Sequence, residues 1–452
     1  MLGRELYSRT RATRSLGVAG RLGFVYSIYM DLLAVITQVK PMKRFFVISA
    51  LFSGVLFFPS YSARCEDWPG WRGPRGDGTS IEKNIPTRCD AEQLVWKTAL
   101  PGVGHASPIV WGDRVFTLSA LSDKEDRVLL CLDRKTGKIL WQQTILHASL
   151  EQKHQENSFA SSTPVTDGEK IYIGALDGED VVVAAYDFSG NRIWQSRPGT
   201  FSSPHGYGSS PVLFQDKVII NADSKGDAFL AALSRTDGKT IWKVPQENHF
   251  LSYSTPLIRE AAGRAQMFHC GDKGVAAHDP NDGSRLWFVD GPSDEFVVSP
   301  IYNERLELLF ISSGYPKQVI LAIKPDGQGD VTESHVAWRA TQGAPYVPSL
   351  ITEGDYLLSV STKGVAFCYE AATGNILWQE KLGKHHASPV SADGLVYFLN
   401  DDGVMNVIKP GKEFVRVAQS ELGETAYASP AVSQGQLFVR GDKHLFCFGK
   451  DL

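Results

Sequence analysis

The 452-residue sequence lacks the motifs that would mark a redox, metal-binding or phosphoryl-transfer protein. Its six cysteines form no CxxC or CxxCH motif, which excludes a covalently attached haem or a zinc knuckle at the level of motifs. HRD, DFG and glycine-rich nucleotide motifs are also missing, so nothing supports a protein-kinase activity. Apolar residues do not recur at the spacing of about 3.6 residues that a helical repeat would show. No Pro/Ser-rich linker divides the chain, which is therefore expected to fold as one large domain.

The sequence does contain an eightfold repeat, in which a proline introduces each hydrophobic run. The prolines are spaced by 41 to 56 residues, and seven of the eight follow Ser or Thr. They are Pro108, Pro164, Pro211, Pro256, Pro300, Pro348, Pro389 and Pro430. Each repeat reads as four short strands, the first of which starts at the proline, where a missing N–H costs least. Four-stranded units at this period indicate the blades of a β-propeller.

The two ends of the sequence predict how the ring closes. The last repeat stops after its third strand, HLFCFG, whereas an additional strand, LVWKTAL around Trp96, precedes the first repeat. Pairing of these two segments would leave no open sheet edge. The sequence therefore predicts an all-β fold, an eight-bladed β-propeller closed by the N-terminal strand and formed by residues 66–452.

This repeat resembles the pyrroloquinoline-quinone (PQQ) propeller repeat of bacterial quinoprotein dehydrogenases and of the propeller lipoprotein in the outer-membrane barrel-assembly machinery. The segments DWPGWRGPRGDG (67–78), ENSFASSTPVTDG, HGYGSSPVL, GDVTESHVAW, PYVPS and KHLFCFG resemble a group of PQQ-like repeat proteins common in planctomycete-type bacteria. The resemblance implies that last-strand tryptophans dock between neighbouring blades. These are Trp96, Trp141, Trp194, Trp242, Trp287, Trp338 and Trp378. In the seventh repeat, Val415 or Val417 stands where tryptophan is expected.

The first 65 residues are expected to be removed before the protein functions. A charged start at Met42 and the apolar run 45–58 are typical of a signal peptide, here residues 42–65, with cleavage before Glu66. Residues 1–41 are interpreted as an upstream start chosen in error, or as a leader. A membrane anchor in this stretch is the alternative, which Arg21 and Asp31 weaken. Lipidation of Cys65 is disfavoured because arginine precedes it. The protein is thus predicted to be exported, either periplasmic or associated with the cell envelope.

Charge argues against nucleic acid as a partner. The first 65 residues hold nine basic and two acidic residues, so the rest of the chain has 37 basic and 48 acidic residues, a net charge of −11. An acidic surface of this kind does not attract a phosphate backbone. We expect a monomer with no transmembrane domain in the mature chain.

The remaining cysteines are expected to act as small hydrophobic residues. Cys131, Cys368 and Cys447 occupy the same third-strand position in three blades, and such positions lie too far apart to form disulfides. For Cys89 and Cys270, both a disulfide and free thiols remain open.

Polar and aromatic residues gather in the loops that lead into the innermost strands. Because these strands should all run in the same direction along the axis, the loops should meet at one end of the ring. The candidate binding residues are His105, Glu156, Asn157, His205, Tyr207, Tyr253, Tyr346, His385 and His386. They either bind a ligand or only plug the channel. The catalytic residues, if there are any, cannot be named from the sequence.

No metal site is predicted. The segment Asp223 to Asp227 resembles the start of a calcium loop but lacks the distal Glu, so a β-turn explains it better. His385 and His386 are adjacent, and adjacent side chains in an extended segment point in opposite directions.

Four functional hypotheses follow. The favoured one is a non-catalytic scaffold that binds a protein or glycan in the cell envelope, with no cofactor. A PQQ-dependent oxidoreductase with quinone and calcium in the central funnel is the main alternative. The resemblance implies that such an enzyme would have calcium ligands beside the quinone and often an adjacent cysteine pair, and the latter is missing. A lyase or hydrolase that uses the His-rich face and a structural envelope component are the other two.

Overall fold

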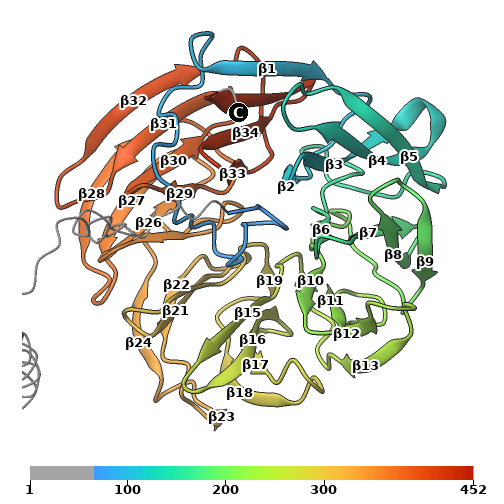
Figure 1. Ribbon diagram of the computed structural model, residues 1–452. Helices are drawn as coiled ribbons and strands as arrows, with labels where there is room; N and C mark the ends of the chain where they lie inside the picture. The colour runs from blue at the N-terminus through green and yellow to red at the C-terminus, as the bar shows by residue number, and fades with distance from the viewer. Residues whose placement is uncertain (1–65, 451–452) are drawn as a thin grey trace, which may run out of the picture. The chain divides into compact units, whose positions relative to one another are not determined.

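The computed structural model describes residues 66–450, so the predicted leader (1–41) and signal peptide (42–65) lie outside the described residues. Within residues 66–450, eight antiparallel sheets are arranged in a ring (Figure 1). This arrangement confirms the predicted eight-bladed propeller. Among these residues no helix has the length and apolar character needed to cross a membrane.

The first four blades follow one another along the chain. Blade 1 contains β2 (Ile109–Trp111), β3 (Arg114–Leu121), β4 (Asp126–Asp133) and β5 (Ile139–His147), with a 3-10 turn, η2 (Ser122–Lys124). Blade 2 contains β6 (Val165–Thr166), β7 (Lys170–Asp177), β8 (Asp180–Asp187) and β9 (Arg192–Ser196). Blade 3 contains β10 (Val212–Phe214), β11 (Lys217–Ala222), β12 (Phe229–Ser234) and β13 (Thr240–Pro245). Blade 4 contains β15 (Leu257–Ala261), β16 (Arg264–Gly271), β17 (Gly274–His278) and β18 (Arg285–Asp290), and β23 (Gly329–Asp330) adds to its outer edge.

The other four blades complete the ring. Blade 5 contains β20 (Ile301–Asn303), β21 (Leu308–Ser312), β22 (Ile320–Ile323) and β24 (Val336–Ala340). Blade 6 contains β25 (Ile351–Glu353), β26 (Tyr356–Val360), β27 (Val365–Glu370) and β28 (Ile376–Lys381). Blade 7 contains β29 (Val390–Ala392), β30 (Leu395–Leu399), β31 (Val404–Lys409) and β32 (Val415–Glu421). Blade 8 contains β33 (Ala431–Ser433), β34 (Gln436–Arg440), β35 (His444–Gly449) and β1 (Leu94–Ala99). A separate parallel pair joins β14 (Leu251–Ser252) to β19 (Glu295–Phe296).

The position of a strand within its blade explains its composition. The two middle strands of blade 1, β3 and β4, are buried at six consecutive residues each, because neighbouring blades cover both faces of the sheet. Such strands are continuously apolar, as in VLLCL. The outermost strand, β5, has five exposed residues among its nine because its edge meets solvent. The core of the fold therefore lies between the blades.

A ladder of hydroxyl groups links the inner ends of the blades. The backbone N–H of Ser107 in blade 1 donates a hydrogen bond of 2.9 Å to Thr163 Oγ1 in blade 2. The same bond, 2.8–3.2 Å long, recurs from Thr163 to Ser210, Ser210 to Thr255, Thr255 to Ser299, Ser299 to Ser349, Ser349 to Ser388 and Ser388 to Ser429. Only Ser107 Oγ, among the hydroxyls of this ladder in the described chain, is buried without a partner.

The ladder corrects the alignment of one repeat. In blade 6 the hydroxyl belongs to Ser349, two residues before β25 begins, just as Ser107 lies two residues before β2. Leu350 therefore occupies the position that proline has in the other repeats. The alignment of Pro348 with the other seven prolines was wrong by two residues, because the ladder requires the hydroxyl and not the proline.

Tryptophans link the outer parts of the blades. The indole N–H of Trp141 in blade 1 donates 3.0 Å to the carbonyl of Phe188, in the turn between β8 and β9 of blade 2. Equivalent bonds run from Trp96 to Arg134, Trp194 to Arg235, Trp242 to Pro280, Trp287 to Pro325, Trp338 to Ala371 and Trp378 to Gly411. The ring of Trp96 also lies on Gly137, where φ is +69° and a Cβ would come within 2.5 Å of the indole. Glycine is required there to let the tryptophan approach.

Blade 7 breaks this pattern, and the residue at the tryptophan position is not the one expected. The register places Ala418 opposite Val407, as Trp378 lies opposite Cys368 in blade 6. Val415 and Val417 are instead each 46% exposed. A tryptophan in blade 7 would have no turn to contact, because strands three and four of blade 8 come from opposite ends of the chain.

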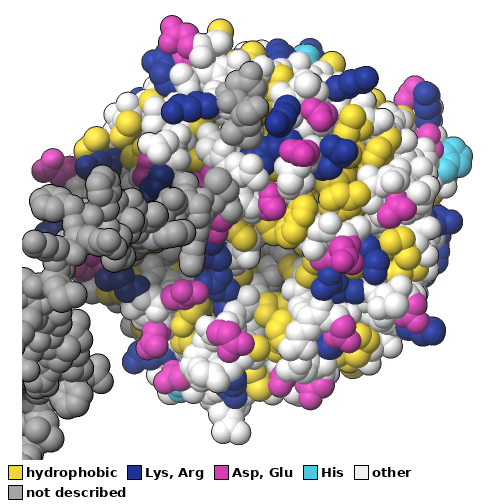
Figure 2. All heavy atoms as spheres, in the orientation of Figure 1, with side chains coloured by type: hydrophobic (Ala, Val, Ile, Leu, Met, Phe, Trp, Pro, Cys, Tyr) yellow, Lys and Arg dark blue, Asp and Glu magenta, His cyan; other side chains and the backbone are white. Residues whose placement is uncertain are grey.

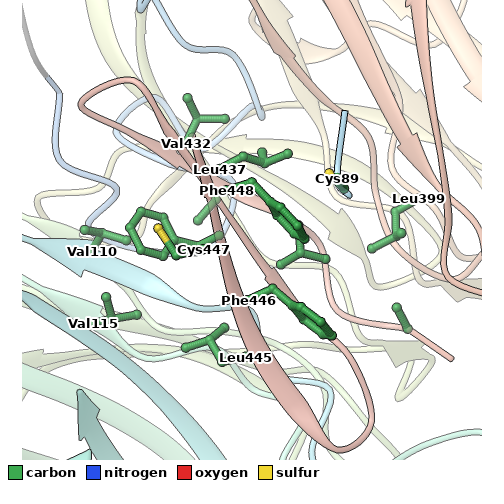
Figure 3. Packing of buried hydrophobic residues seen from close by; sticks show 14 of the residues in the cluster. Cys89, Val110, Val115, Leu399, Val432, Leu437, Leu445, Phe446, Cys447 and Phe448 are labelled. Atoms are coloured by element: carbon green, nitrogen blue, oxygen red, sulfur yellow. The ribbon is translucent and has the colours of Figure 1, made fainter. Parts of the chain in front are cut away.

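Blade 8 joins the two ends of the described chain. β1 pairs antiparallel with β35, with Trp96 opposite Cys447 and Ala99 opposite His444. Hydrophobic side chains of β34 and β35 pack there against blades 1 and 7 (Figure 3). Cys89, which precedes β1, is buried in the same cluster. Cys89, Cys131, Cys270 and Cys368 are buried free thiols, so Cys89 and Cys270 do not pair.

Residues 66–93, here called the N-terminal segment, run across the inner ends of several blades before β1. Trp68 exchanges two backbone hydrogen bonds with Val110 in β2, and Ser80 donates to Ser391 in β29. Arg72, which is 1% exposed, donates to the carbonyls of Leu350 and Pro389 in blades 6 and 7. These contacts lie within the first two residues of an innermost strand or one residue before it, so the segment packs along the inner edges of blades 1, 6 and 7.

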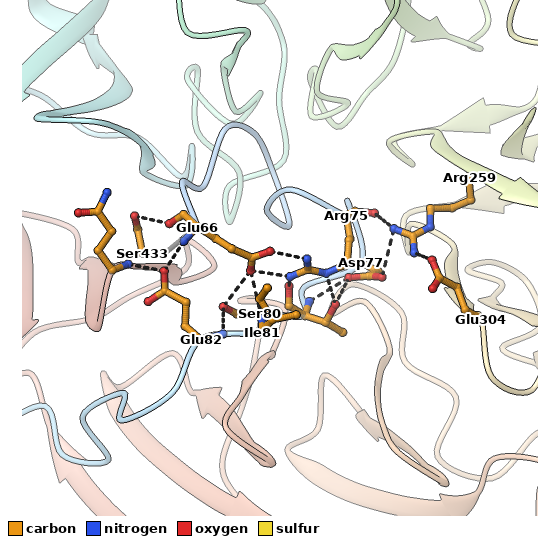
Figure 4. A network of polar contacts seen from close by, with 11 residues as sticks. Glu66, Arg75, Asp77, Ser80, Ile81, Glu82, Arg259, Glu304 and Ser433 are labelled. Carbon is orange, nitrogen blue, oxygen red and sulfur yellow. Dashed lines mark hydrogen bonds and ion pairs between the residues drawn. The ribbon is translucent and has the colours of Figure 1, made fainter. Parts of the chain in front are cut away.

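A network of ion pairs fixes the N-terminal segment to blades 4 and 8 (Figure 4). Arg75 binds both carboxylate oxygens of Glu66, at 2.6 and 2.8 Å. Glu82 accepts hydrogen bonds from the backbone N–H groups of Gln434 and Gly435 in blade 8. Asp77 lies 3.9 Å from Arg259, which comes from β15.

We expect Trp287→Ala to lower the free energy of unfolding by roughly 3–5 kcal/mol, the usual cost of removing a large core side chain. Trp287 is fully buried, and its indole also donates 2.8 Å to Gln266 Oε1, which would lose its partner. Equilibrium unfolding in guanidinium measures the change. Val417→Ala, at an exposed position, is the control and should change stability by no more than about 0.5 kcal/mol. Equal midpoints for the two variants would contradict the docking role.

Candidate funnel site

A cavity of about 500 Å³, here called the funnel, opens among the loops that precede the innermost strands. Seven of the nine predicted residues line it: His105, Glu156, Asn157, His205, Tyr253, Tyr346 and His386. They come from the loops that precede the innermost strands of blades 1, 2, 3, 4, 6 and 7. The ladder hydroxyls Ser107, Ser210, Thr255, Ser388 and Ser429 also line the cavity. The ladder thus holds the loops that carry the candidate residues.

The other two predicted residues, Tyr207 and His385, lie in the core. Tyr207 is 5% exposed and packs edge-on against Phe201, with ring centroids 5.2 Å apart. His385 is fully buried, and its Nδ1 lies 2.6 Å from the carbonyl oxygen of Gly383. His385 and His386 follow one another in an extended segment, so only one of the two can face the funnel.

Several residues that line the funnel were not predicted. Glu295, Lys384 and Tyr427 precede innermost strands, as the predicted residues do, so the repeat alignment could have found them. His154 lies in the long loop after β5. Trp71 comes from the N-terminal segment, where no repeat signal exists.

A charged cluster lies on one wall of the funnel. His386 Nδ1 lies 2.9 Å from Asp401 Oδ2, and its Nε2 lies 3.7 Å from Glu156 Oε2. Lys384 forms an ion pair with Glu156 and lies 3.9 Å from Asp401. The hydrogen bond from Lys384 lowers the pKa of Glu156, so this carboxylate is ionised at neutral pH.

Two arcs of aromatic rings form much of the remaining wall. In the first, Tyr427 lies between His386 and His105, with centroid separations of 5.1 and 4.8 Å. In the second, His205 lies between His154 and Tyr253, at 5.8 and 5.9 Å. Burial and the charge of Arg440 lower the pKa of His105 to about 3, so its imidazole is neutral at neutral pH. These rings present apolar faces together with nitrogen and hydroxyl groups.

Tyr346, from the loop that precedes blade 6, donates a hydrogen bond of 2.7 Å to Glu295 Oε1. Burial, followed by this bond, raises the pKa of Tyr346, so its hydroxyl remains protonated. Asn157 has its side-chain amide occupied, because it donates 2.7 Å to the carbonyl of His205 and accepts from Ser161.

Trp71 lines the funnel from the N-terminal segment, and this part of the wall is here called the floor. It also lines a second hollow, of about 190 Å³, formed with the inner ends of blades 2 to 4. In the view of Figure 2, acidic and basic side chains are interspersed over the blades, and hydrophobic side chains gather near the middle of the ring.

The described residues contain no group of three or more His, Cys, Asp or Glu side chains arranged to hold a metal ion. In the segment that resembled a calcium loop, Asp223 is buried and accepts a hydrogen bond from the backbone N–H of Asp272. Asp227 instead accepts one from the N–H of Thr200. The two carboxylates thus serve different neighbours. Burial raises the pKa of Asp223 to about 8.

The sequence profile of a family described as outer membrane protein assembly factor BamB matches residues 89–149, 124–295 and 317–412. A quinohemoprotein alcohol dehydrogenase from Pseudomonas putida is 22% identical over 309 residues, covering 60% of this chain and 42% of that protein. An outer membrane protein assembly factor BamB from Nitrosomonas eutropha is 24% identical over 266 residues, covering 56% and 47%. The matches thus span less than half of the length of these curated relatives.

Solved structures show the same fold. BamB from Moraxella catarrhalis superposes with a TM-score of 0.58 at 15% identity, covering 79% of this chain and 99% of that one. Quinohemoprotein alcohol dehydrogenase from Comamonas testosteroni superposes with a TM-score of 0.51 at 15% identity, covering 85% and 80%. At these identities the superpositions show the propeller fold alone.

The buried His385 should make stability depend on pH. Burial lowers its pKa from 6.5 to about 4 in the folded protein. Between these values the unfolded chain binds more protons, so stability falls as the pH decreases through this window. His385→Asn removes this loss, and the variant should therefore be less destabilised relative to wild type at pH 5 than at pH 7.5. Urea unfolding at the two pH values measures the difference.

His249→Asn, at an exposed position, is the matched control and should have a small effect at both pH values. A stability difference between His385→Asn and wild type that does not change with pH would contradict the burial of a neutral imidazole.

Proposed function

Because the chain belongs to the family of outer membrane protein assembly factor BamB, we propose that it is an exported propeller that binds a partner in the cell envelope. The partner is a protein or a glycan, and it binds at the funnel face. The propeller acts by holding this partner and performs no chemistry on it. The name shared by the family and the Nitrosomonas relative, outer membrane protein assembly factor, supports an envelope location.

The observation that carries the proposal is that the ionisable groups of the funnel satisfy one another. Both ring nitrogens of His386 face carboxylates, Asp401 on one side and Glu156 on the other. Its Nδ1 is hydrogen-bonded to Asp401 at 2.9 Å, whereas its Nε2 lies 3.7 Å from Glu156, beyond the length of a hydrogen bond. Glu156 is neutralised by Lys384, and Glu295 accepts from Tyr346. The pairing of both glutamates supports a site that binds a partner without using them as acid or base.

The lining residues do not fit the quinone and calcium of the dehydrogenase relatives. PQQ is a tricarboxylate, whereas Lys384 is the one lysine or arginine among the described residues that line the funnel, and it is already paired. Calcium takes about six to eight oxygen ligands. Glu156 is paired with Lys384, Glu295 accepts from Tyr346, and the amide of Asn157 is occupied. This donor set supports the scaffold over the quinoprotein.

The export part of the proposal is supported by the environment of Glu66. Its backbone nitrogen donates 2.7 Å to Glu82 Oε1, and Glu82 is 4% exposed. Cleavage before Glu66 would convert this nitrogen into an ammonium group, which a buried carboxylate stabilises more strongly than a neutral N–H. The proposed domain boundaries are therefore a leader at 1–41, a signal peptide at 42–65 and the propeller from residue 66.

The proposed function is tested by site-specific photo-crosslinking in producing cells. A benzophenone amino acid at Tyr427, on the funnel wall, should give an adduct of defined mass with one envelope component. The same group at Ile241, which is 43% exposed on the outer strand of blade 3, is the matched control and should not. In parallel, the purified chain with PQQ and calcium should not reduce an electron-accepting dye with alcohols. Quinone-dependent dye reduction would overturn the scaffold.

Processing gives a second prediction. Intact-mass measurement of the protein recovered from the envelope should identify Glu66 as the first residue. Glu82→Gln should destabilise this mature form more than it destabilises a form that retains residues 42–65, because only the mature form carries the ammonium group. A mature chain that begins elsewhere, or equal effects in the two forms, would contradict the assignment.

A further inference from the structure

We propose that the funnel binds the terminal, uncharged sugar ring of a glycan, stacked on its aromatic wall. This inference rests on the proposed function, since it names the class of partner that the same cavity holds. The cavity of about 500 Å³ falls within the range of about 300–1,000 Å³ that is usual for small-molecule sites.

The wall has the two kinds of surface that a sugar ring requires. A pyranose has flat faces of C–H groups and a rim of hydroxyls. The first arc offers the rings of Tyr427, His386 and His105, which all line the cavity, and the floor offers Trp71. Aromatic rings of this type combine an apolar face with a polar edge. The neutral imidazole of His105 provides both a donor and an acceptor for hydroxyl groups.

The charge of the funnel disfavours anionic ligands. Lys384 is neutralised by Glu156, and Glu295 remains as a carboxylate with a tyrosine partner. Asp401 lies behind His386 and adds a further negative charge. Phosphate, nucleotide or polycarboxylate groups would meet these carboxylates without a free cation. A ligand with hydroxyl groups and no acid group avoids this repulsion.

The channel also leaves little room for a peptide strand. Peptides commonly add to an open strand edge through main-chain hydrogen bonds. Here Trp68 already occupies the edge of β2, and Ser80 occupies that of β29. Trp71 also lines the funnel, and a long chain would have to pass this side chain. The terminal unit of a glycan needs no such passage.

The inference is tested with the full chain and defined oligosaccharides. The probes are maltotriose, cellotriose, mannotriose and N,N′,N″-triacetylchitotriose, with trigalacturonic acid as the anionic counterpart, each up to 10 mM. Calorimetry and the quenching of tryptophan fluorescence report binding. We expect at least one neutral trisaccharide to bind and the anionic one to bind more weakly. Tyr427→Ala and Trp71→Ala should each weaken binding roughly three- to tenfold, as expected for the loss of one stacking contact.

Tyr356→Ala, on β26 outside the funnel, is the matched control and should bind like wild type. Thermal unfolding of each variant, recorded without sugar, separates a lost contact from a lost fold. Absence of binding to every neutral probe, tighter binding of trigalacturonic acid, or equal affinity in Tyr427→Ala and wild type would each overturn the inference. If no sugar binds but the benzophenone at Tyr427 still captures one envelope protein, the sugar proposal fails and the scaffold stands. Dye reduction with PQQ would instead remove the scaffold itself.

Discussion

The inner wall of this propeller depends on one repeated interaction, the hydrogen bond from a backbone N–H of one blade to a serine or threonine hydroxyl of the next. Seven such bonds run from Ser107 to Ser429. Each N–H is buried where neither water nor a strand partner reaches it, and a buried N–H without a partner costs about 1–3 kcal/mol. A small side chain with an acceptor is therefore required before the innermost strands of blades 2 to 8, whereas the hydroxyl of Ser107 in blade 1 has no partner. The same ladder fixes the spacing of the loops that carry the funnel residues.

The tryptophans also link neighbouring blades, but farther from the axis of the propeller. Each indole fills the space between two blades and donates to a turn carbonyl of the next one, so apolar burial and a satisfied donor coincide in one side chain. The turn glycines, such as Gly137, are the complementary half of this contact. The hydroxyl ladder thus sets the distance between neighbouring blades near the axis of the propeller, and the tryptophans set it near the outer edge. With contacts at both places, a blade has little freedom to tilt.

The sequence was sufficient for the fold because the fold is repeated. A Ser/Thr-Pro start, an alternating run and a closing tryptophan recur often enough to reveal four strands per unit, and the unmatched strand around Trp96 revealed the pairing of the ends. Blade 6 misled the alignment because Pro348 is a better sequence signal than Ser349, although the hydroxyl is what the structure uses.

The candidate site was less accessible from the sequence, because it depends on where side chains point. The loops were predicted to converge. Adjacent side chains in an extended segment point in opposite directions, and the sequence does not say which of the two, His385 or His386, faces the funnel. Trp71 escaped prediction for a different reason. It belongs to a segment that occurs once, and its position at the funnel floor comes from Arg72 and Trp68 binding blades that are far away in sequence.

The junction between blades 7 and 8 differs from the other seven, since it has Ala418 where they have tryptophan. The N-terminal segment spans it instead. Cys89 donates to Ser420 on blade 7, while Glu82 binds the turn before β34 of blade 8. That same segment carries the floor of the funnel. The junction between blades 7 and 8 is therefore held by the N-terminal segment, which also lines the binding cavity. A ligand that contacts Trp71 binds only when the N-terminal segment is in place. Its binding free energy therefore adds to the stability of the junction between blades 7 and 8.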